Sequence, residues 1–232
     1  MPNVLITGSS RGLGNHLHRV LAQRSWQTFP LVRNERDASA LKDRHPDCHP
    51  VITDVACDAA VADIRRGLHG KVRRLDVLVN NAGFGGKARR VEEVTSEELL
   101  ELLQVHCLGA IRCTKAVLPL LGPGSKVVNV TSRLGSMARN AGGHYAPGSF
   151  SYTYRIAKAA QNMFTLCLSQ QLREKNVAVY GIHPGRLLTD SAAHDADTPP
   201  ELAAEKLANW IDSATLEESG RLFEPAKGEI PW

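Results

Sequence analysis

The sequence predicts an α/β fold: a doubly wound parallel sheet with helices on both faces. Two observations predict it, because short apolar runs recur along the chain and segments with helical spacing lie between them. The runs lack the alternation with polar residues that is typical of a sheet with one wet face, so we expect both faces to be covered. A chain of 232 residues, 43% of them hydrophobic and without repeats or linkers, is expected to form one domain over residues 1–232.

Five apolar runs are expected to form the buried strands of this sheet. Because strand and helix alternate, we expect parallel neighbours joined by right-handed crossovers. A packing of helices without a sheet is the alternative, and the recurring apolar runs argue against it. The expected strands are Val4–Ile6, Phe29–Val32, Leu75–Val79, Val127–Val130 and Val177–Ile182.

Three of the intervening segments show clear helical patterns. A helix is expected from about Ser96 to Leu121, and Thr95-x-x-Glu98 at its start is typical of a capping box. Another is expected from about Tyr152 to Lys175. The helix after the first strand is indicated by apolar residues at helical spacing, namely Leu13, Leu17, Val20 and Leu21.

Composition excludes several classes of protein. The net charge of +4 is mild and the paired arginines are scattered without aromatic residues between them, so no nucleic-acid partner is expected. No apolar run reaches the ~18 residues of a membrane span, and the first strand begins too early to leave room for a signal peptide. The five cysteines form no C-x-x-C pair and are expected to be reduced thiols of a cytoplasmic protein. No residues fall at metal-ligand spacing, so no metal is expected.

A glycine-rich turn follows the first strand directly and reads Thr7-Gly8-Ser9-Ser10-Arg11-Gly12-Leu13-Gly14. Glycines at such a turn permit a tight reversal, close approach of the backbone to a pyrophosphate, and close packing of the next helix. The N-terminus of that helix offers free N–H groups and partial positive charge to phosphates. A tight turn without a ligand is the alternative. The strand–turn–helix context favours a dinucleotide site.

The end of the second strand indicates which dinucleotide is bound. An acidic residue there would hold the ribose hydroxyls of NAD, whereas an arginine pairs with the 2′-phosphate of NADP. This chain has Arg33 after Val32, with Arg11 in the glycine turn on the same side, so NADP(H) is favoured over NAD(H). An Arg33 that merely points to solvent is the alternative. A methyltransferase would need an acidic residue at this place, so Arg33 argues against that class.

Tyr154 and Lys158 stand four residues apart in a helical pattern, which puts both side chains on one face of the helix. An ammonium beside a phenol is expected to lower the pKa of the phenol, so that it can exchange a proton with a carbonyl or alcohol oxygen. Ser132 ends a predicted strand, where ligands bind in such sheets, and its hydroxyl could hold the same oxygen. A chance spacing and an ordinary turn serine are the alternatives.

Further landmarks accompany these residues in order along the chain. They are Asp54-Val55, Asn80-Asn81-Ala82-Gly83, and Pro184-Gly185 with Thr189. With the turn of Thr7–Gly14, Ser132, Tyr154 and Lys158, the pattern resembles the short-chain dehydrogenase/reductase family across essentially the whole chain. The segments from 152 to 162, 183 to 185 and 228 to 232 are similar to the C-factor-like subgroup of carbonyl reductases.

The resemblance implies a single-domain Rossmann fold and an NADP(H)-dependent oxidoreductase. Such an enzyme transfers hydride between the nicotinamide and the carbon of a small-molecule carbonyl or secondary alcohol. Tyr154 would be the acid/base, Lys158 would tune it and bind the nicotinamide ribose, and Ser132 would orient the substrate oxygen. The residues implied at the cofactor, besides Tyr154 and Lys158, are Gly8, Ser10, Arg11, Gly12, Leu13, Gly14, Arg33, Asp54 and Val55 (adenine), Asn81 (bracing the sheet), Ala82, Gly83, Pro184, Gly185 and Thr189 (carboxamide).

The chain departs from the family pattern at His106, within Val105-His106-Cys107-Leu108-Gly109, where the family usually has an asparagine that helps to hold a water behind the lysine. Either the imidazole does this work, as a further catalytic residue, or it is a packed helix histidine. His106 is also the main support for an alternative function: a dinucleotide-binding sensor or signalling protein with weak or no catalysis.

Two segments near the expected site are candidates for substrate recognition. The spacing of 22 residues from Ser132 to Tyr154 is longer than the commonest spacing in the family. The inserted residues 142–150 could shape substrate choice through Tyr145 and Phe150, or be surface decoration. Residues 186–200 could form a lid or a plain connection. The family commonly pairs through the helix that contains Phe164 and Leu168, so a homodimer or homotetramer is consistent with its apolar residues, although core packing also explains them.

Overall fold

One eight-stranded sheet organises the computed structural model, which describes residues 1–188, 196–225 and 227–232. The strand order is β3-β2-β1-β4-β5-β6-β7-β8, and all neighbours are parallel except β7 and β8. The five predicted strands are confirmed, and the α/β fold with them; a sheet that is parallel throughout is wrong only at β8. The strands are β1 (Asn3–Thr7), β2 (Gln27–Val32), β3 (Val51–Ile52), β4 (Val77–Asn80), β5 (Lys126–Val130), β6 (Ala178–Ile182), β7 (Leu222–Glu224) and β8 (Gly228–Ile230).

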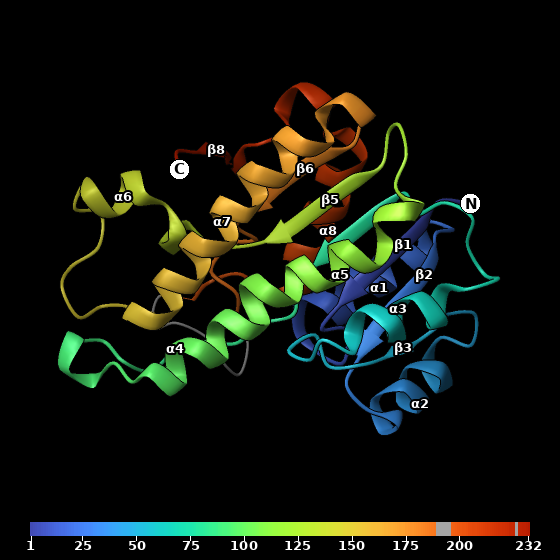
Figure 1. Cartoon of the computed structure of the whole chain (residues 1–232), viewed down its shortest axis with the longest axis horizontal. Coiled ribbons are helices and arrows are strands. Elements are labelled where there is room, and N and C mark those ends of the chain that lie inside the picture. Colours follow the sequence, from blue (N-terminus) through green and yellow to red (C-terminus); the bar gives the residue numbers. More distant parts are fainter. Residues whose placement is uncertain (189–195, 226) are drawn as a thin grey trace.

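Helices cover both faces of the sheet (Figure 1). Those that pack on one face are α1 (Gly12–Gln23) and α8 (Pro200–Ser213), and those on the other are α3 (Ala60–Leu68), α5 (Gly109–Val117) and α7 (Tyr152–Leu172). The remaining α-helices of the described residues are α2 (Glu35–Arg44), α4 (Ser96–Leu103) and α6 (Met137–Ala141). Within the described ranges, every helix is too short or too polar to cross a bilayer.

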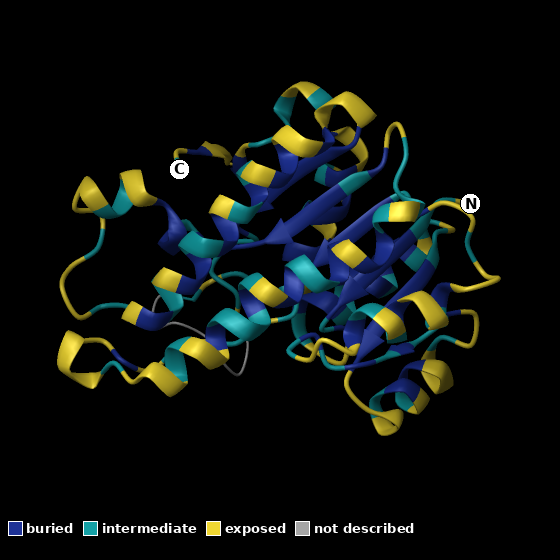
Figure 2. Ribbon diagram, in the orientation of Figure 1, coloured by how far each residue is buried: buried dark blue, intermediate teal, exposed yellow. Residues whose placement is uncertain are grey.

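The sheet separates two apolar clusters, one on each face, because successive side chains of a strand point to opposite faces. In β1, Val4 and Ile6 belong to the cluster with α1 and α8, whereas Leu5 belongs to the cluster with α3, α5 and α7. All three are fully buried, and each such side chain stabilises the fold by about 1.5–3 kcal/mol. Figure 2 shows the result, with buried strands at the centre and exposed residues on the outer faces of the helices.

The helix expected from about Ser96 to Leu121 is one helical rod with a defect in its middle. A π-helical turn, Gln104–Leu108, joins α4 to α5, and a 3₁₀ turn ends the rod at Leu120. A π turn holds one residue more than an α turn, so it redirects the side chains that it carries. Here it brings His106 into the interior, where it is 2% exposed.

The capping box expected at the start of α4 is only half formed. The Thr95 hydroxyl accepts a hydrogen bond from the Glu98 backbone N–H, as predicted. The Glu98 carboxylate does not return to Thr95; it accepts from the backbone N–H groups of Lys87 and Ala88 and from the Thr153 hydroxyl. Glu98 therefore ties the segment after β4 to the first turn of α7.

Buried amide and hydroxyl groups fix α7 against the sheet. Asn80 of β4 donates to Asn129 of β5 at 2.8 Å, and Asn129 donates to the Thr165 hydroxyl of α7 at 2.9 Å. All three residues are at most 3% exposed. Because an unpaired polar group in the interior is costly, this chain of hydrogen bonds favours one register of α7 over its neighbours.

The burial of His18 predicts that the folded protein becomes less stable as the pH falls. This α1 residue is fully buried, and neither ring nitrogen has a hydrogen-bond partner among the described residues. Burial, followed by the charge of His45, lowers the pKa of His18 to about 4. Between pH ~6.5 and pH ~4 the unfolded chain therefore binds a proton at His18 that the native state does not bind. As a result, about 2 kcal/mol of the free energy of unfolding is lost between pH 7 and pH 4.5. Urea unfolding at the two pH values measures this loss.

The variant His18→Leu removes the titrating group and keeps an apolar side chain. Its free energy of unfolding is expected to fall less between pH 7 and pH 4.5 than that of the parent protein. His69→Gln, at an exposed position, is the matched control and should behave as the parent does. An equal pH dependence in His18→Leu and the parent would contradict the account.

Candidate active site

The carboxyl ends of the central strands open into a cleft with a volume of about 1110 Å³. Most of the residues singled out from the sequence line it together. Gly14 lies beneath the glycine turn instead, and Thr189 lies outside the described residues. The lining set comprises Gly8, Ser10, Arg11, Gly12, Leu13, Arg33, Asp54, Val55, Asn81, Ala82, Gly83, His106, Ser132, Tyr154, Lys158, Pro184 and Gly185.

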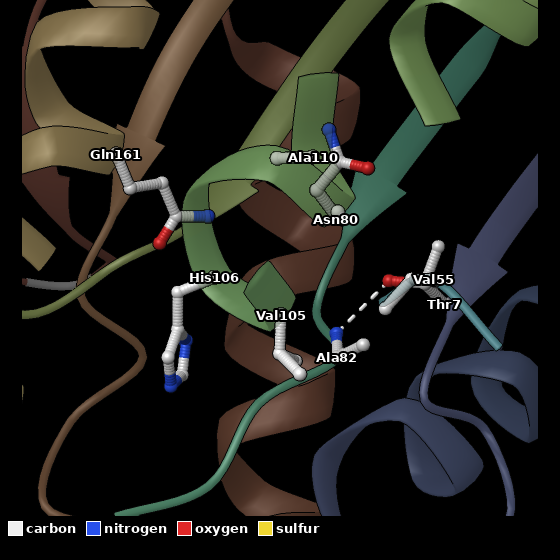
Figure 3. Close-up of a pocket in the computed structure, with 9 residues that line it drawn as sticks. Thr7, Val55, Asn80, Ala82, Val105, His106, Ala110 and Gln161 are labelled. Carbon is white, nitrogen blue, oxygen red and sulfur yellow. Dashed lines mark hydrogen bonds between the residues drawn. The ribbon is translucent and has the colours of Figure 1, made fainter. Parts of the chain in front are cut away.

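The glycine turn is pressed against the end of β4. Gly8 has φ +68°, and a Cβ there would lie 2.8 Å from the Ala82 Cα, so both the backbone conformation and the space require glycine. The Thr7 hydroxyl accepts hydrogen bonds from the backbone N–H groups of Asn81 and Ala82, and the Ala82 bond is drawn in Figure 3. The Asn81 amide donates to the Thr7 carbonyl at 2.8 Å. These bonds brace the turn that forms the floor of the cleft.

The first turn of α1 faces the cleft with its backbone N–H groups uncapped. No side chain caps this helix, and no acidic residue lies in its first turn. By contrast, Asn34 caps α2 and Ser151 caps α7. An uncapped helix N-terminus is a favourable place for an anion. Gly14 lets α1 approach the turn, because a Cβ there would lie 2.5 Å from the Gly8 carbonyl oxygen.

Positive charge gathers at the end of the cleft next to β2. Arg11 and Arg33 both line the cleft and are exposed. The residues at the end of β2 that line the cleft are Leu31, Val32 and Arg33, so no carboxylate lies among them. This arrangement suits an anionic group, and these three residues offer no carboxylate to hold ribose hydroxyls.

Tyr154 lies in the first turn of α7, which begins where it does because the Ser151 hydroxyl caps the helix and accepts from the Tyr154 N–H. The Ser132 hydroxyl is the polar side-chain neighbour of the Tyr154 phenol, and it accepts a hydrogen bond from the Leu134 backbone N–H at 3.1 Å. Burial raises the pKa of Tyr154 to about 12, and the neighbouring Ser132 hydroxyl opposes this rise. In the protein without cofactor, desolvation of the phenolate is the largest cause, so the pKa of Tyr154 is raised and not lowered; Lys158 Nζ lies 5.7 Å from the ring centroid.

Lys158 lies one turn further along α7 and is 4% exposed. Its Nζ donates to the Val130 carbonyl oxygen at 2.8 Å and to Gln161 Oε1 at 2.9 Å. Burial lowers the pKa of Lys158 to about 7. Gln161 was not predicted from the sequence as part of the site; its position three residues after Lys158, on the same helix face, is the signal that points to it.

His106 is held by the segment after β4. Its Nε2 lies 2.9 Å from the Phe84 carbonyl oxygen and 3.4 Å from the Phe84 backbone nitrogen, so Nε2 donates to the carbonyl in one tautomer and accepts from the N–H in the other. Burial, followed by the charge of Lys158, holds the pKa of His106 well below its usual value, so the ring is neutral. The ring packs edge to face on Tyr154 with centroids 5.5 Å apart. A Cβ at Gly83 would lie 2.3 Å from the His106 Cε1, so the histidine requires that glycine. These contacts fit a packed histidine beside the site.

The insertion at 142–150 contributes two residues, Ser149 and Phe150, to the cleft wall. Phe150 lines the cleft, whereas Tyr145 does not; its hydroxyl donates to the Arg133 carbonyl oxygen at 3.0 Å. The guanidinium carbon of Arg133 lies 5.5 Å from both ring centroids. The described ends of the 186–200 segment are joined, because Leu187 pairs with Thr198 and Arg186 forms an ion pair with Asp197. The residues between them, 189–195, lie outside the described part of the chain.

Comparisons with known proteins agree with this site. The short chain dehydrogenase family profile matches residues 2–199. C-signal of Myxococcus xanthus is 36% identical over 160 residues, which cover 68% of this chain and 93% of that protein. The 1-hydroxy-2-glutathionyl-2-methyl-3-butene dehydrogenase of Rhodococcus sp. (strain AD45) is 32% identical over 236 residues and covers 98% of each chain.

The fold matches solved structures equally well. The carbonyl reductase Sniffer of D. melanogaster superposes with a TM-score of 0.89 at 28% identity, and the match covers 100% of both chains. Together with the order of the landmark residues, these similarities identify the chain. It belongs to the short-chain dehydrogenase/reductase family of oxidoreductases, in keeping with the C-factor-like subgroup.

Proposed function

We propose that this chain is a single domain, residues 1–232, that reduces a small-molecule carbonyl with NADPH or oxidises the corresponding secondary alcohol with NADP⁺. The observation that carries the proposal is that Tyr154 and Ser132 are side-chain neighbours, with the Lys158 amine one helical turn away, in the cleft that begins at the glycine turn. The names of the Rhodococcus dehydrogenase and of the Sniffer carbonyl reductase support this chemistry.

The residues of the cleft fit a phosphorylated nicotinamide dinucleotide. The uncapped first turn of α1 and Gly8 suit the pyrophosphate. Arg11 and Arg33 suit the 2′-phosphate. When bound, such a cofactor supplies or accepts the hydride. Asp54, Val55, Ala82, Gly83, Pro184 and Gly185 line the remaining wall and would complete its site, as proposed from the resemblance.

The side chains of this chain supply the proton and its control. In reduction, the Tyr154 hydroxyl donates its proton to the carbonyl oxygen as hydride arrives at the carbonyl carbon, so that C=O becomes CH–OH. A phenol with a pKa of about 12 holds this proton at neutral pH. The Ser132 hydroxyl bonds the same oxygen and orients it. The ammonium of Lys158 stabilises the phenolate that remains, and oxidation reverses each step.

A sensor or signalling protein with weak catalysis is the second candidate, and the match to C-signal favours it. Such a protein would bind NADPH tightly yet oxidise none of it with a panel of aldehydes, ketones and quinones. The reductase predicts oxidation of NADPH with at least one member of that panel. The cytoplasmic location and a homodimer or homotetramer stay predictions from the sequence.

Replacing Tyr154 by phenylalanine tests the proposed acid. The variant Tyr154→Phe removes the proton and keeps the ring that packs on His106, so NADPH-dependent reduction is expected to fall by at least about 100-fold while NADPH binding persists. Tyr152→Phe, on the exposed side of the same turn, is the matched control and should retain parent activity. Full activity in Tyr154→Phe would exclude the mechanism.

Replacing Arg33 by serine tests the preference for the phosphorylated cofactor. Loss of one charge-assisted contact to the 2′-phosphate is expected to weaken NADPH binding by about tenfold or more and to leave NADH binding unchanged. Fluorescence titration with both reduced cofactors measures the two affinities. Arg36→Ser, an exposed change in α2, is the control. Equal weakening for NADPH and NADH, or no change for either, would argue against a phosphate contact at Arg33.

A further inference from the structure

The Lys158 amine has two fixed acceptors behind it. One is the backbone carbonyl of Val130, at the end of β5, and the other is the side-chain amide oxygen of Gln161, on the next turn of α7. An ammonium has three N–H donors, so these two bonds fix the direction of the third, which is left for a group in the cleft that Lys158 lines. Among the described residues, Gln161 is the side-chain acceptor for this amine.

No nearby charge substitutes for this amide oxygen. The titratable groups that face the amine are Tyr154 from the same helix and His106 from the π turn, and both are neutral near pH 7. Arg133 after β5 and His183 after β6 also line the cleft. The described carboxylates of the cleft, Asp54 and Glu101, form no ion pair or hydrogen bond with Lys158 in the described part of the chain. The charged form of the amine therefore depends on its two acceptors.

Water cannot easily replace the amide, because the space around Gln161 is closed. Gln161 is 1% exposed and lies in a small pocket with Asn80 and His106, which are 3% and 2% exposed. Figure 3 shows the Gln161 side chain directed toward the helical turn that carries His106. A polar group enclosed in this way keeps the partner that the protein gives it.

We propose that Gln161 is a positioning residue that keeps the Lys158 amine charged and aims its free N–H into the cleft. The proposal rests on the proposed function only for its kinetic consequence, since the amine and its acceptors are properties of the protein itself. Burial alone brings the pKa of Lys158 to about 7, so the loss or gain of one acceptor changes the fraction of charged amine near neutral pH.

The direct test is a side-chain NMR titration of the cofactor-free protein labelled in lysine, with the Lys158 signal assigned by its absence in Lys158→Met. Gln161→Leu removes the acceptor at similar size and is expected to move the Lys158 titration midpoint down by about one pH unit. Gln161→Glu replaces it by a carboxylate and should move the midpoint up by about one unit or more. Gln170→Leu, on the exposed face of α7, is the matched control and should leave the midpoint unchanged.

The kinetic test uses the pH dependence of NADPH oxidation with a carbonyl that the parent protein reduces. The decline of activity toward high pH is expected to begin at lower pH in Gln161→Leu and at higher pH in Gln161→Glu. A residue that only fills space would lower stability or the overall rate and leave this pH dependence in place.

The outcomes separate this inference from the proposed function. A Lys158 midpoint that is the same in the parent and in Gln161→Glu overturns the inference, and this variant decides the matter if Gln161→Leu does not fold. Opposite midpoint shifts in a protein that reduces no carbonyl support the inference and count against the proposed reductase. If the protein reduces a carbonyl but the Lys158 titration midpoint is unchanged in both Gln161 variants, the proposed reductase is retained and Gln161 has no positioning role in it.

Discussion

The site depends on one constraint: an amine is buried where β5 ends. Taking an ammonium out of water is costly unless acceptors surround it, so the Lys158 Nζ must lie against the Val130 carbonyl and Gln161. This requirement sets the distance between α7 and the sheet. The hydrogen bonds from Asn80 through Asn129 to Thr165 hold the same face of the helix in the same register further along its length. With α7 fixed, the Ser151 cap determines where Tyr154 lies relative to Ser132.

Burial then acts in opposite directions on the pKa values of Tyr154 and Lys158, which both lie on α7. It raises the pKa of the Tyr154 phenol to about 12 and lowers the pKa of the Lys158 amine to about 7. Both shifts favour the uncharged form, so the protein alone holds a protonated acid beside an amine whose charge is easily changed. Neutral His106 packs on the phenol and keeps the segment after β4 close through Phe84. The chemistry expected of the cleft follows from this desolvation as much as from the residue types.

Most of the fold could be predicted from the sequence, because buried parallel strands are continuous apolar runs and the glycine turn and Tyr154-x-x-x-Lys158 have recognisable spacings. The remainder depends on tertiary contacts. β8 has three residues, too few for a pattern, and pairs antiparallel at the edge of the sheet. The Glu98 carboxylate does not complete the capping box, because it accepts hydrogen bonds from the Lys87 backbone N–H after β4 and from the Thr153 hydroxyl instead. The π turn, the role of Gln161 and the direction of the Tyr154 pKa shift all require knowledge of what is buried against what.

The measurement that tests the central claim most directly is the fate of a labelled hydride. NADPH carrying two deuterium atoms at the reactive carbon of its nicotinamide ring is mixed with the protein and a carbonyl compound, and the product is examined by mass spectrometry. The account predicts one deuterium on the carbon that bore the carbonyl oxygen and a proton from solvent on its oxygen. An alcohol product without deuterium, or unchanged carbonyl compound in the presence of bound NADPH, would contradict it.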